Sequence, residues 1–112
     1  MIARIWRGRA VGANAAAYQR HVTQSVFPTL PALAGHRGAY LLRRETGEGT
    51  EFLAVTLWDS LAAIRAFAGE DAERAVVEPG AREVLADFDA FVRHYEVVHG
   101  PACAGSEEAG RK

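Results

Sequence analysis

Residues 52–58 form the clearest hydrophobic pattern of the chain, an uncharged apolar stretch that passes directly into a helical pattern. Successive side chains of a strand point to opposite faces of its sheet, so this stretch presents two faces. They consist of Phe52, Ala54, Thr56 and Trp58 on one side and Leu53, Val55 and Leu57 on the other. A sheet with helices on one side only should carry polar residues on its free side. The pattern therefore predicts a strand that is covered on both faces.

Three other segments have the composition of strands, namely residues 2–11, 36–46 and 88–99. A turn over 47–50 contains two glycines and joins the strand 36–46 to the apolar strand that follows it. Two strands connected by so short a Gly-containing segment are typical of a hairpin. The chain is thus expected to form four strands, with the central pair adjacent in the sheet.

Apolar residues at helical spacing predict two main helices. The first covers about residues 15–26, with Asn14 as a candidate N-cap residue. The second covers 61–68 and follows Asp59 and Ser60, which are both favourable N-cap residue types. Each helix therefore comes between two strands of the predicted sheet.

A shorter helix is expected over 72–77, closed by Pro79 and Gly80. The main elements follow the order βαββαβ, which is the ferredoxin-like arrangement of a four-stranded antiparallel sheet with helices on one face. This α+β domain is predicted over 1–99, and the small, polar residues 100–112 are expected to form a flexible tail. The other sheet face is apolar, so we expect a homodimer in which a second copy covers it.

Composition and charge narrow the classes of partner. The 112 residues carry a formal net charge of −1. Because binding to nucleic acid phosphates requires a basic surface, nucleic acid is not expected as a partner. No apolar run approaches the ~20 residues that span a membrane. Cys103 is the only cysteine, which excludes an internal disulfide and fits the reducing cytoplasm. We therefore expect a cytoplasmic protein with a small-molecule partner.

Four segments resemble one known family, the antibiotic biosynthesis monooxygenase (ABM) domains. They are residues 2–6, 35–44, 56–60 and 67–68, and the Leu-Trp-Asp-Ser sequence over 57–60 is the most recognisable. The resemblance covers about residues 1–99 and implies a dimeric α/β barrel. Some members of the family oxidise polycyclic aromatic or quinol-like substrates with O2 and without flavin, haem or metal. Others cleave haem.

The haem-cleaving relatives use an Asn, a Trp and a His at three positions of this fold. Those positions fall at about Arg7, Phe67 and Val77, and none of the three residue types matches. The resemblance therefore favours the oxygenases that work without a cofactor.

His21 is the candidate catalytic residue. It shares one face of the first predicted helix with Tyr18, Val22 and Val26. A histidine on such a face is either a hydrogen-bonded core residue or a base, because imidazole titrates near neutral pH and can accept a phenolic proton. Both interpretations of His21 stay open at this point.

Candidate substrate-binding residues come from the strands and the second helix. Trp58 is either a core residue or a pocket wall, and the small Ala54 and Thr56 on its face leave room beside it. Tyr40 is either packed in the core with its hydroxyl at the rim or part of the pocket. Arg43 and Arg44 either form a solvated hairpin end or hold an anionic substrate. The substrate-binding set is Tyr18, Tyr40, Thr56, Trp58 and Phe67.

No Cys pair, His-Glu-x-x-His, Gly-x-Gly-x-x-Gly or P-loop sequence is present, so neither a metal site nor a nucleotide cofactor is expected. The expected function is a cofactor-independent monooxygenase that oxidises a small aromatic or quinol-like substrate in an apolar pocket between sheet and helices. Two alternatives stay open. One is a non-catalytic dimeric barrel that binds a small apolar ligand in a stress or regulatory role, and the other is haem binding.

Overall fold

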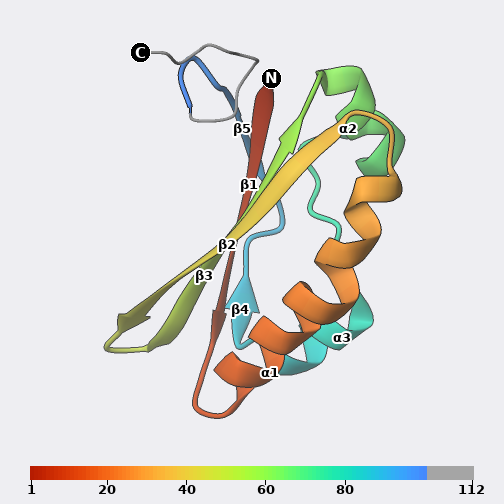
Figure 1. Ribbon diagram of the computed structural model, residues 1–112. Coiled ribbons are helices and arrows are strands. Elements are labelled where there is room, and N and C mark those ends of the chain that lie inside the picture. The colour runs from red at the N-terminus through yellow and green to blue at the C-terminus, as the bar shows by residue number, and fades with distance from the viewer. Residues whose placement is uncertain (101–112) are drawn as a thin grey trace.

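An antiparallel sheet forms the back of the molecule in the computed structural model, which describes residues 1–100 (Figure 1). Its strands are β1 (Ile2–Ala10), β2 (His36–Thr46), β3 (Gly49–Trp58), β4 (Asp87–Phe88) and β5 (Arg93–Glu96). The strand order is β2-β3-β1-β4, and β5 also pairs with β1. The helices lie against one face of this sheet and leave the other face open (Figure 1). The predicted ferredoxin-like α+β fold is therefore confirmed.

The first predicted helix is present, but its winding changes along its length. It consists of α1 (Asn14–His21), a π-helical turn η1 (Val22–Val26) and a 3-10 segment η2 (Phe27–Ala32). The expectation that Asn14 is the N-cap is wrong, because Ala13 holds that position and no side chain caps the helix. Short π-helical turns inside helices often occur at functional sites.

The second predicted helix is α2 (Leu61–Ala68), and its start agrees with the sequence-based prediction. Ser60 has an extended backbone, and its side chain accepts a hydrogen bond from the Ala63 N–H at 3.2 Å. This bond satisfies one of the free N–H groups at the helix start. Gly69 ends the helix with a φ of 99°, a conformation that favours glycine.

The short helix predicted over 72–77 is wrong. That segment runs beside residues 90–92, with Ala75 N–H donating to the Ala90 carbonyl at 2.9 Å and Val92 N–H to the Glu73 carbonyl at 2.7 Å. Helix α3 (Pro79–Val84) instead begins where the sequence suggested a helix end. Proline is well suited to the first turn of a helix, since its missing N–H is not needed there.

The last predicted strand is interrupted, because β4 and β5 both pair with β1 but are separated by residues 89–92. Those residues turn toward the 73–75 segment, as the Arg74–Phe91 bridge shows. The long-range pairing therefore converts the expected continuous strand into two short ones. The same pairing holds residues 73–75 in place over the helix side of the sheet.

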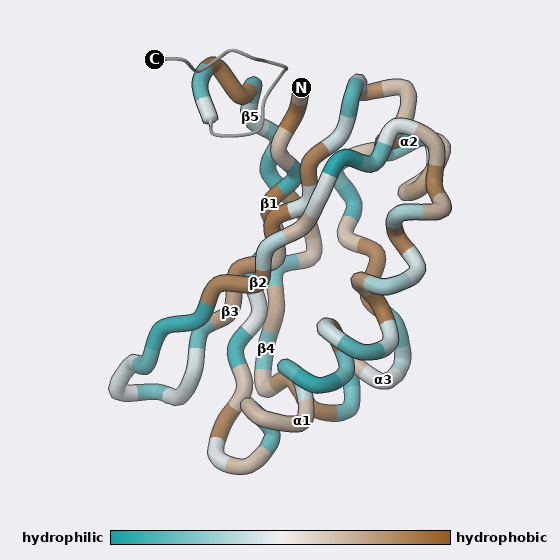
Figure 2. Tube along the Cα trace, in the orientation of Figure 1, coloured by the Kyte–Doolittle hydropathy of each residue, from teal (hydrophilic) through white to brown (hydrophobic). Residues whose placement is uncertain are grey.

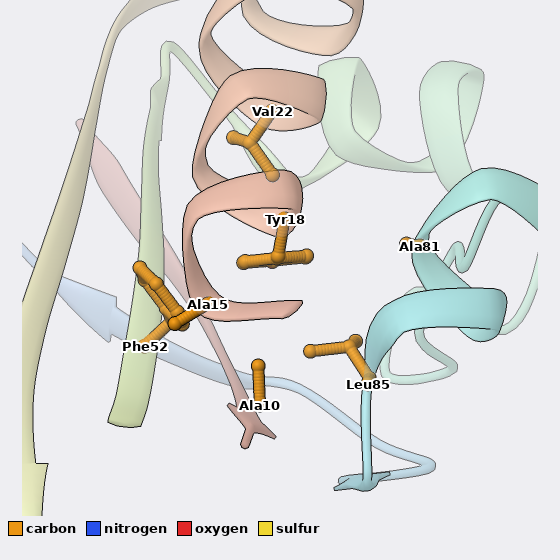
Figure 3. Close-up of a cluster of buried hydrophobic side chains, with 7 residues drawn as sticks. All are labelled: Ala10, Ala15, Tyr18, Val22, Phe52, Ala81 and Leu85. Carbon is orange, nitrogen blue, oxygen red and sulfur yellow. The ribbon is translucent and has the colours of Figure 1, made fainter. Parts of the chain in front are cut away.

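Alternate residues of β3 face two different environments, as the sequence predicts. Phe52 and Trp58 are almost fully buried under the helices. Figure 3 shows Phe52 beside Ala15 and near Tyr18 of α1, with Ala81 of α3 on the other side of Tyr18 in the same buried cluster. On the open face, Tyr40 and Leu42 of the neighbouring strand are 53% and 49% exposed.

The hydropathy of the sheet changes along its length. Figure 2 shows polar residues at the tip of the β2–β3 hairpin and apolar residues toward its middle. Within residues 1–100, no helix is long and apolar enough to cross a membrane. Residues 101–112 of the predicted tail, including Cys103, lie outside the described residues, so its flexibility stays a prediction.

Candidate functional site

A partly open cavity of about 90 Å³ lies between the sheet and the helices. Ala54 and Thr56 form part of its floor, since these small residues stand between the large side chains of Phe52 and Trp58. The π-helical turn η1 contributes Val22 and Val26 to the wall. The segment after α2 covers another side with Val76, Val77 and Glu78. The cavity is smaller than the clefts of ~300–1,000 Å³ that hold drug-sized ligands.

His21 lines this cavity, where its ring is held tightly. A Cβ atom at Gly80 would lie only 2.9 Å from the His21 Cε1, so glycine lets α3 approach the imidazole. The His21 Nε2 lies 3.3 Å from a Glu78 carboxylate oxygen. The two atoms are not aligned for a hydrogen bond, however, and this buried Nε2 has no partner within residues 1–100. The His21 Nε2 thus makes no hydrogen bond to the described part of the chain.

Tyr18 also lines the cavity and is 1% exposed. Its ring packs against Phe52 with the ring centres 4.8 Å apart. Burial raises the pKa of Tyr18 to about 12, because the charged phenolate is poorly solvated there. The hydroxyl therefore stays protonated near neutral pH and is available as a hydrogen-bond donor.

Phe67 and Thr56 line the cavity as well, whereas Trp58 lies behind them. The Trp58 ring stacks on Phe67 with the ring centres 5.2 Å apart, and its Nε1 donates to the Thr56 hydroxyl at 2.8 Å. Trp58 is completely buried, so of its two interpretations the structure favours the core residue. It positions two wall residues rather than forming a wall itself.

Tyr40 is not part of this site, and the expectation that it lines the pocket is wrong. It pairs with Val55 on the open face of the sheet. A register shift between His36 and Gly38 sets which residues of β2 share that face. Arg43 and Arg44 also lie outside the cavity, since their guanidinium groups bind Gln19, Glu45 and Glu51.

Two further strand residues in the cavity were not identified as site residues from the sequence. Trp6 lies on the helix side, and its Nε1 donates to the Asp89 carbonyl at 2.6 Å. Arg4 shares this face and lines the cavity although it is only 5% exposed. The sequence does indicate the position of Arg4, because strand alternation places it on the same face as Trp6 and Gly8.

Arg4 is held mainly by backbone carbonyls. Its Nη1 donates to the Ala72 carbonyl and lies 3.2 Å from the His94 Nε2, and its Nη2 donates to the Arg74 carbonyl at 2.9 Å. Its guanidinium carbon lies 5.8 Å from the centre of the Phe67 ring. Burial lowers the pKa of Arg4 because it disfavours the charged form.

No group of three or more His, Cys, Asp or Glu residues in the described part of the chain could hold a metal ion. The positions that correspond to the haem-cleaving set also separate in space. Phe67 and Val77 line the cavity, whereas Arg7 lies on the open face and pairs with Glu51 at 2.9 Å. The residues that converge on the cavity are mainly aromatic and aliphatic, and the polar ones among them are Arg4, His21, Thr56 and Glu78.

This fold and this cavity define a class of small ferredoxin-like proteins with a small, partly open cavity between sheet and helices. The chain belongs to the antibiotic biosynthesis monooxygenase family, whose model matches residues 1–79. No curated protein gives a significant sequence match.

Solved structures of this fold are similar over nearly the whole chain. The haem-degrader MhuD from Mycobacterium tuberculosis, with two haems in its active site, is 24% identical, with a TM-score of 0.59 and coverage of 90% of this chain and 99% of its own. A protein from Deinococcus radiodurans assigned to the antibiotic biosynthesis monooxygenases is 17% identical, with a TM-score of 0.58 and coverage of 94% and 100%. At these identities the likeness shows the fold alone.

Proposed function

We propose that this protein is a cofactor-independent monooxygenase that oxidises a small aromatic, quinol-like substrate with O2. The observation that carries the proposal is the His21 imidazole, whose Nε2 makes no hydrogen bond within the described residues although a Glu78 oxygen lies 3.3 Å away, in a cavity otherwise lined mainly by apolar side chains. Membership of the ABM family supports the same reaction class. A fold can host many activities, so the residues of the cavity support this function more specifically than the family does.

The proposed chemistry begins with proton transfer. His21 acts as a general base and removes the hydroxyl proton of the enol form of an anthrone-like substrate. The resulting anion transfers an electron to O2, and recombination places oxygen on the ring carbon. One oxygen atom ends as the product carbonyl and the other leaves as water. For an anthrone-like substrate the four electrons come from its methylene carbon, so the reaction requires no external reductant. A hydroquinone instead supplies two electrons, and its oxidation to the quinone reduces O2 to H2O2.

The protein's own contribution is binding and orientation. Apolar walls exclude water from the reacting anion, and the Tyr18 hydroxyl can donate a hydrogen bond to a substrate oxygen. An engineered apolar cavity of ~150 Å³ binds benzene. A space of about 90 Å³ therefore takes no more than part of an aromatic substrate, and the remainder must extend through the opening.

Oxygen consumption with anthrone and a naphthohydroquinone tests this function. The native protein should accelerate O2 uptake, and His21→Ala should lower the rate by about 10²–10⁴-fold, the usual effect of losing a general base. Arg20→Ala is the matched control, because Arg20 is the exposed neighbour of His21 and does not line the cavity. Full activity in His21→Ala would exclude the proposed function. So would the absence of any acceleration of O2 uptake by the native protein across a broad panel of aromatic substrates.

The open sheet face supports a second part of the proposal, a homodimer. Tyr40, Leu42 and Tyr95 are about half exposed on this face and surround the apolar residues of β3. Ion pairs lie toward the hairpin end, where Glu51 binds both Arg7 and Arg44. An apolar centre with a charged rim is typical of a protein–protein interface. We propose that a second copy of this chain covers the face.

Sedimentation at micromolar concentration tests the dimer. The native protein should have about twice the chain mass, and Leu42→Asp should sediment as a monomer because an interface centre does not tolerate a buried, unpaired charge. The control is Val11→Asp, at an exposed residue that follows β1. A monomeric native protein would contradict the proposal. The cytoplasm stays the proposed compartment, on the basis of the single cysteine.

A ligand-binding protein without turnover is the alternative, and the small cavity favours it. In that case native mass spectrometry would show a bound apolar molecule while oxygen uptake stays at the background rate. Haem binding is the weaker alternative, favoured by the unpartnered His21 nitrogen and by the structural likeness to MhuD. A haem titration without a shift of the Soret band would exclude it.

A further inference from the structure

Arg4 is a buried cation without a carboxylate partner. It is 5% exposed, yet no Asp or Glu oxygen within residues 1–100 lies within the 4.0 Å of an ion pair. The other arginines of β1 contrast with it, since Arg7 pairs with Glu51 and Arg9 with Asp87. Buried charges are usually paired or bound to a ligand, because removing them from water is costly.

The hydrogen bonds of Arg4 are also incomplete. An arginine side chain offers five N–H donors. Nη1 contacts the Ala72 carbonyl and His94, and Nη2 makes a single bond, to the Arg74 carbonyl. Nε has no hydrogen-bond partner in the described part of the chain. One donor on Nε and one on Nη2 thus remain for a ligand, and arginine donors of this kind can bind the two oxygens of a carboxylate.

The surroundings of Arg4 hold it in place without neutralising it. The carbonyls of Ala72 and Arg74 belong to the segment that is fixed by pairing with residues 90–92. His94 accepts from Nη1 only when its Nε2 carries no proton, so it adds no negative charge. The Phe67 ring under the guanidinium also lines the cavity. Arg4 is therefore a fixed, positively charged part of the cavity wall, and the one carboxylate of the lining, Glu78, lies beside His21 and makes no ion pair with Arg4.

We propose that Arg4 binds an anionic oxygen of the cavity's ligand, so that the substrate class is aromatic compounds carrying a carboxylate or an ionised hydroxyl group. The inference rests on the proposed function of the same cavity. In that reaction the proton removed by His21 leaves an oxyanion, and a fixed cation stabilises such a charge where it develops. Arg4 supplies the charge that the apolar walls lack.

The preference for anionic ligands can be measured without turnover. Calorimetric titration with benzoate and with benzamide compares a charged and a neutral ligand of nearly the same shape. The native protein should bind benzoate at least tenfold more tightly, and Arg4→Gln should lose this preference, since glutamine still bonds to carbonyls but carries no charge. Arg4→Lys should keep part of it, and Arg20→Gln, a charge loss on the exposed side of α1, should keep all of it.

A measurement on the native protein keeps the inference testable if the Arg4 variants do not fold. In nitrogen–proton NMR spectra, benzoate should shift the Nε–H resonance of Arg4 and leave that of Arg20 in place, whereas benzamide should shift neither strongly. Equal binding of both ligands, or a preference that survives in Arg4→Gln, would overturn the inference. Anion preference without oxygen uptake would refute the proposed reaction and leave Arg4 as the anion site. Oxygen uptake without anion preference would support the proposed reaction and refute Arg4 as the anion site.

Discussion

The two faces of β3 lie in different surroundings. On the helix side, Phe52 and Trp58 are buried while Ala54 and Thr56 between them leave a cavity. On the open side, residues 53, 55 and 57 continue into half-exposed residues of β2. Both faces are apolar in sequence, yet one is covered by helices and borders a cavity and the other is uncovered. Apolar character alone therefore does not distinguish a ligand site from a surface for a partner.

The difference lies in the sizes of the side chains and in the polar groups that accompany them. Two small residues among aromatic rings create space, and Arg4 and His21 bring polarity into that space. On the open face the polar residues stay at the hairpin end as ion pairs, such as Arg44 with Glu51 at 2.7 Å. An apolar cavity with a few inward polar groups is typical of a ligand site, whereas an apolar surface with a polar rim is typical of a protein interface.

The largest expected effect on stability concerns Trp58. Trp58→Ala should lower the free energy of unfolding by about 3–5 kcal/mol, because it removes a fully buried ring and its stack on Phe67. Leu42→Ala on the open face should lower the free energy of unfolding of the monomer by only about 0.5 kcal/mol. Urea unfolding of both variants gives the comparison. Equal losses would show that the two faces are not distinct in packing.

Filling the cavity should separate the two faces by function. Ala54→Leu should abolish ligand binding and cost up to about 1–3 kcal/mol, since extra methyl groups crowd the floor. Val55→Leu changes the next residue of β3, whose side chain lies on the open face, and should leave ligand binding intact. Calorimetric titration and sedimentation of both variants measure the result. Unchanged ligand binding in Ala54→Leu would place the site elsewhere.

The smallest expected effect is a pH dependence on the helix side. Burial, and then the charge of Arg4, lower the pKa of His94 below 6.5, while Glu73 opposes the shift. The unfolded chain therefore takes up this proton first as the pH falls below about 6.5. The free energy of unfolding should be highest above that pH and decrease until the pH passes the lower pKa of the folded state.

Urea unfolding between pH 7.5 and 5 measures this slope, on the order of a fraction of a proton per molecule. His94→Gln is the matched control, because glutamine can still accept from Arg4 but does not titrate in this range. The slope should become shallower in that variant. An identical slope would assign the effect to another group, such as His36, whose pKa burial also lowers.

Much of this fold follows from interactions between residues that are close together in the sequence. The alternation over 52–58 gave the two faces of β3 correctly, and Ser60 caps α2 as its residue type indicates. These features depend on neighbours in the chain, so a single sequence contains the information. The placement of Tyr18 and His21 on the cavity side follows from helical spacing for the same reason.

Only the tertiary structure decided the features that depend on distant pairing. Residues 72–77 form no helix because residues 73–75 bond to residues 90–92, which overrides their helical pattern. The register shift in β2 carries Tyr40 to the open face. Arg4 becomes a buried cation because the Ala72 and Arg74 carbonyls, about 70 positions away, surround it. Sequence periodicity shows which residues share a face, but the contacts that enclose a charge arise only when the chain has folded.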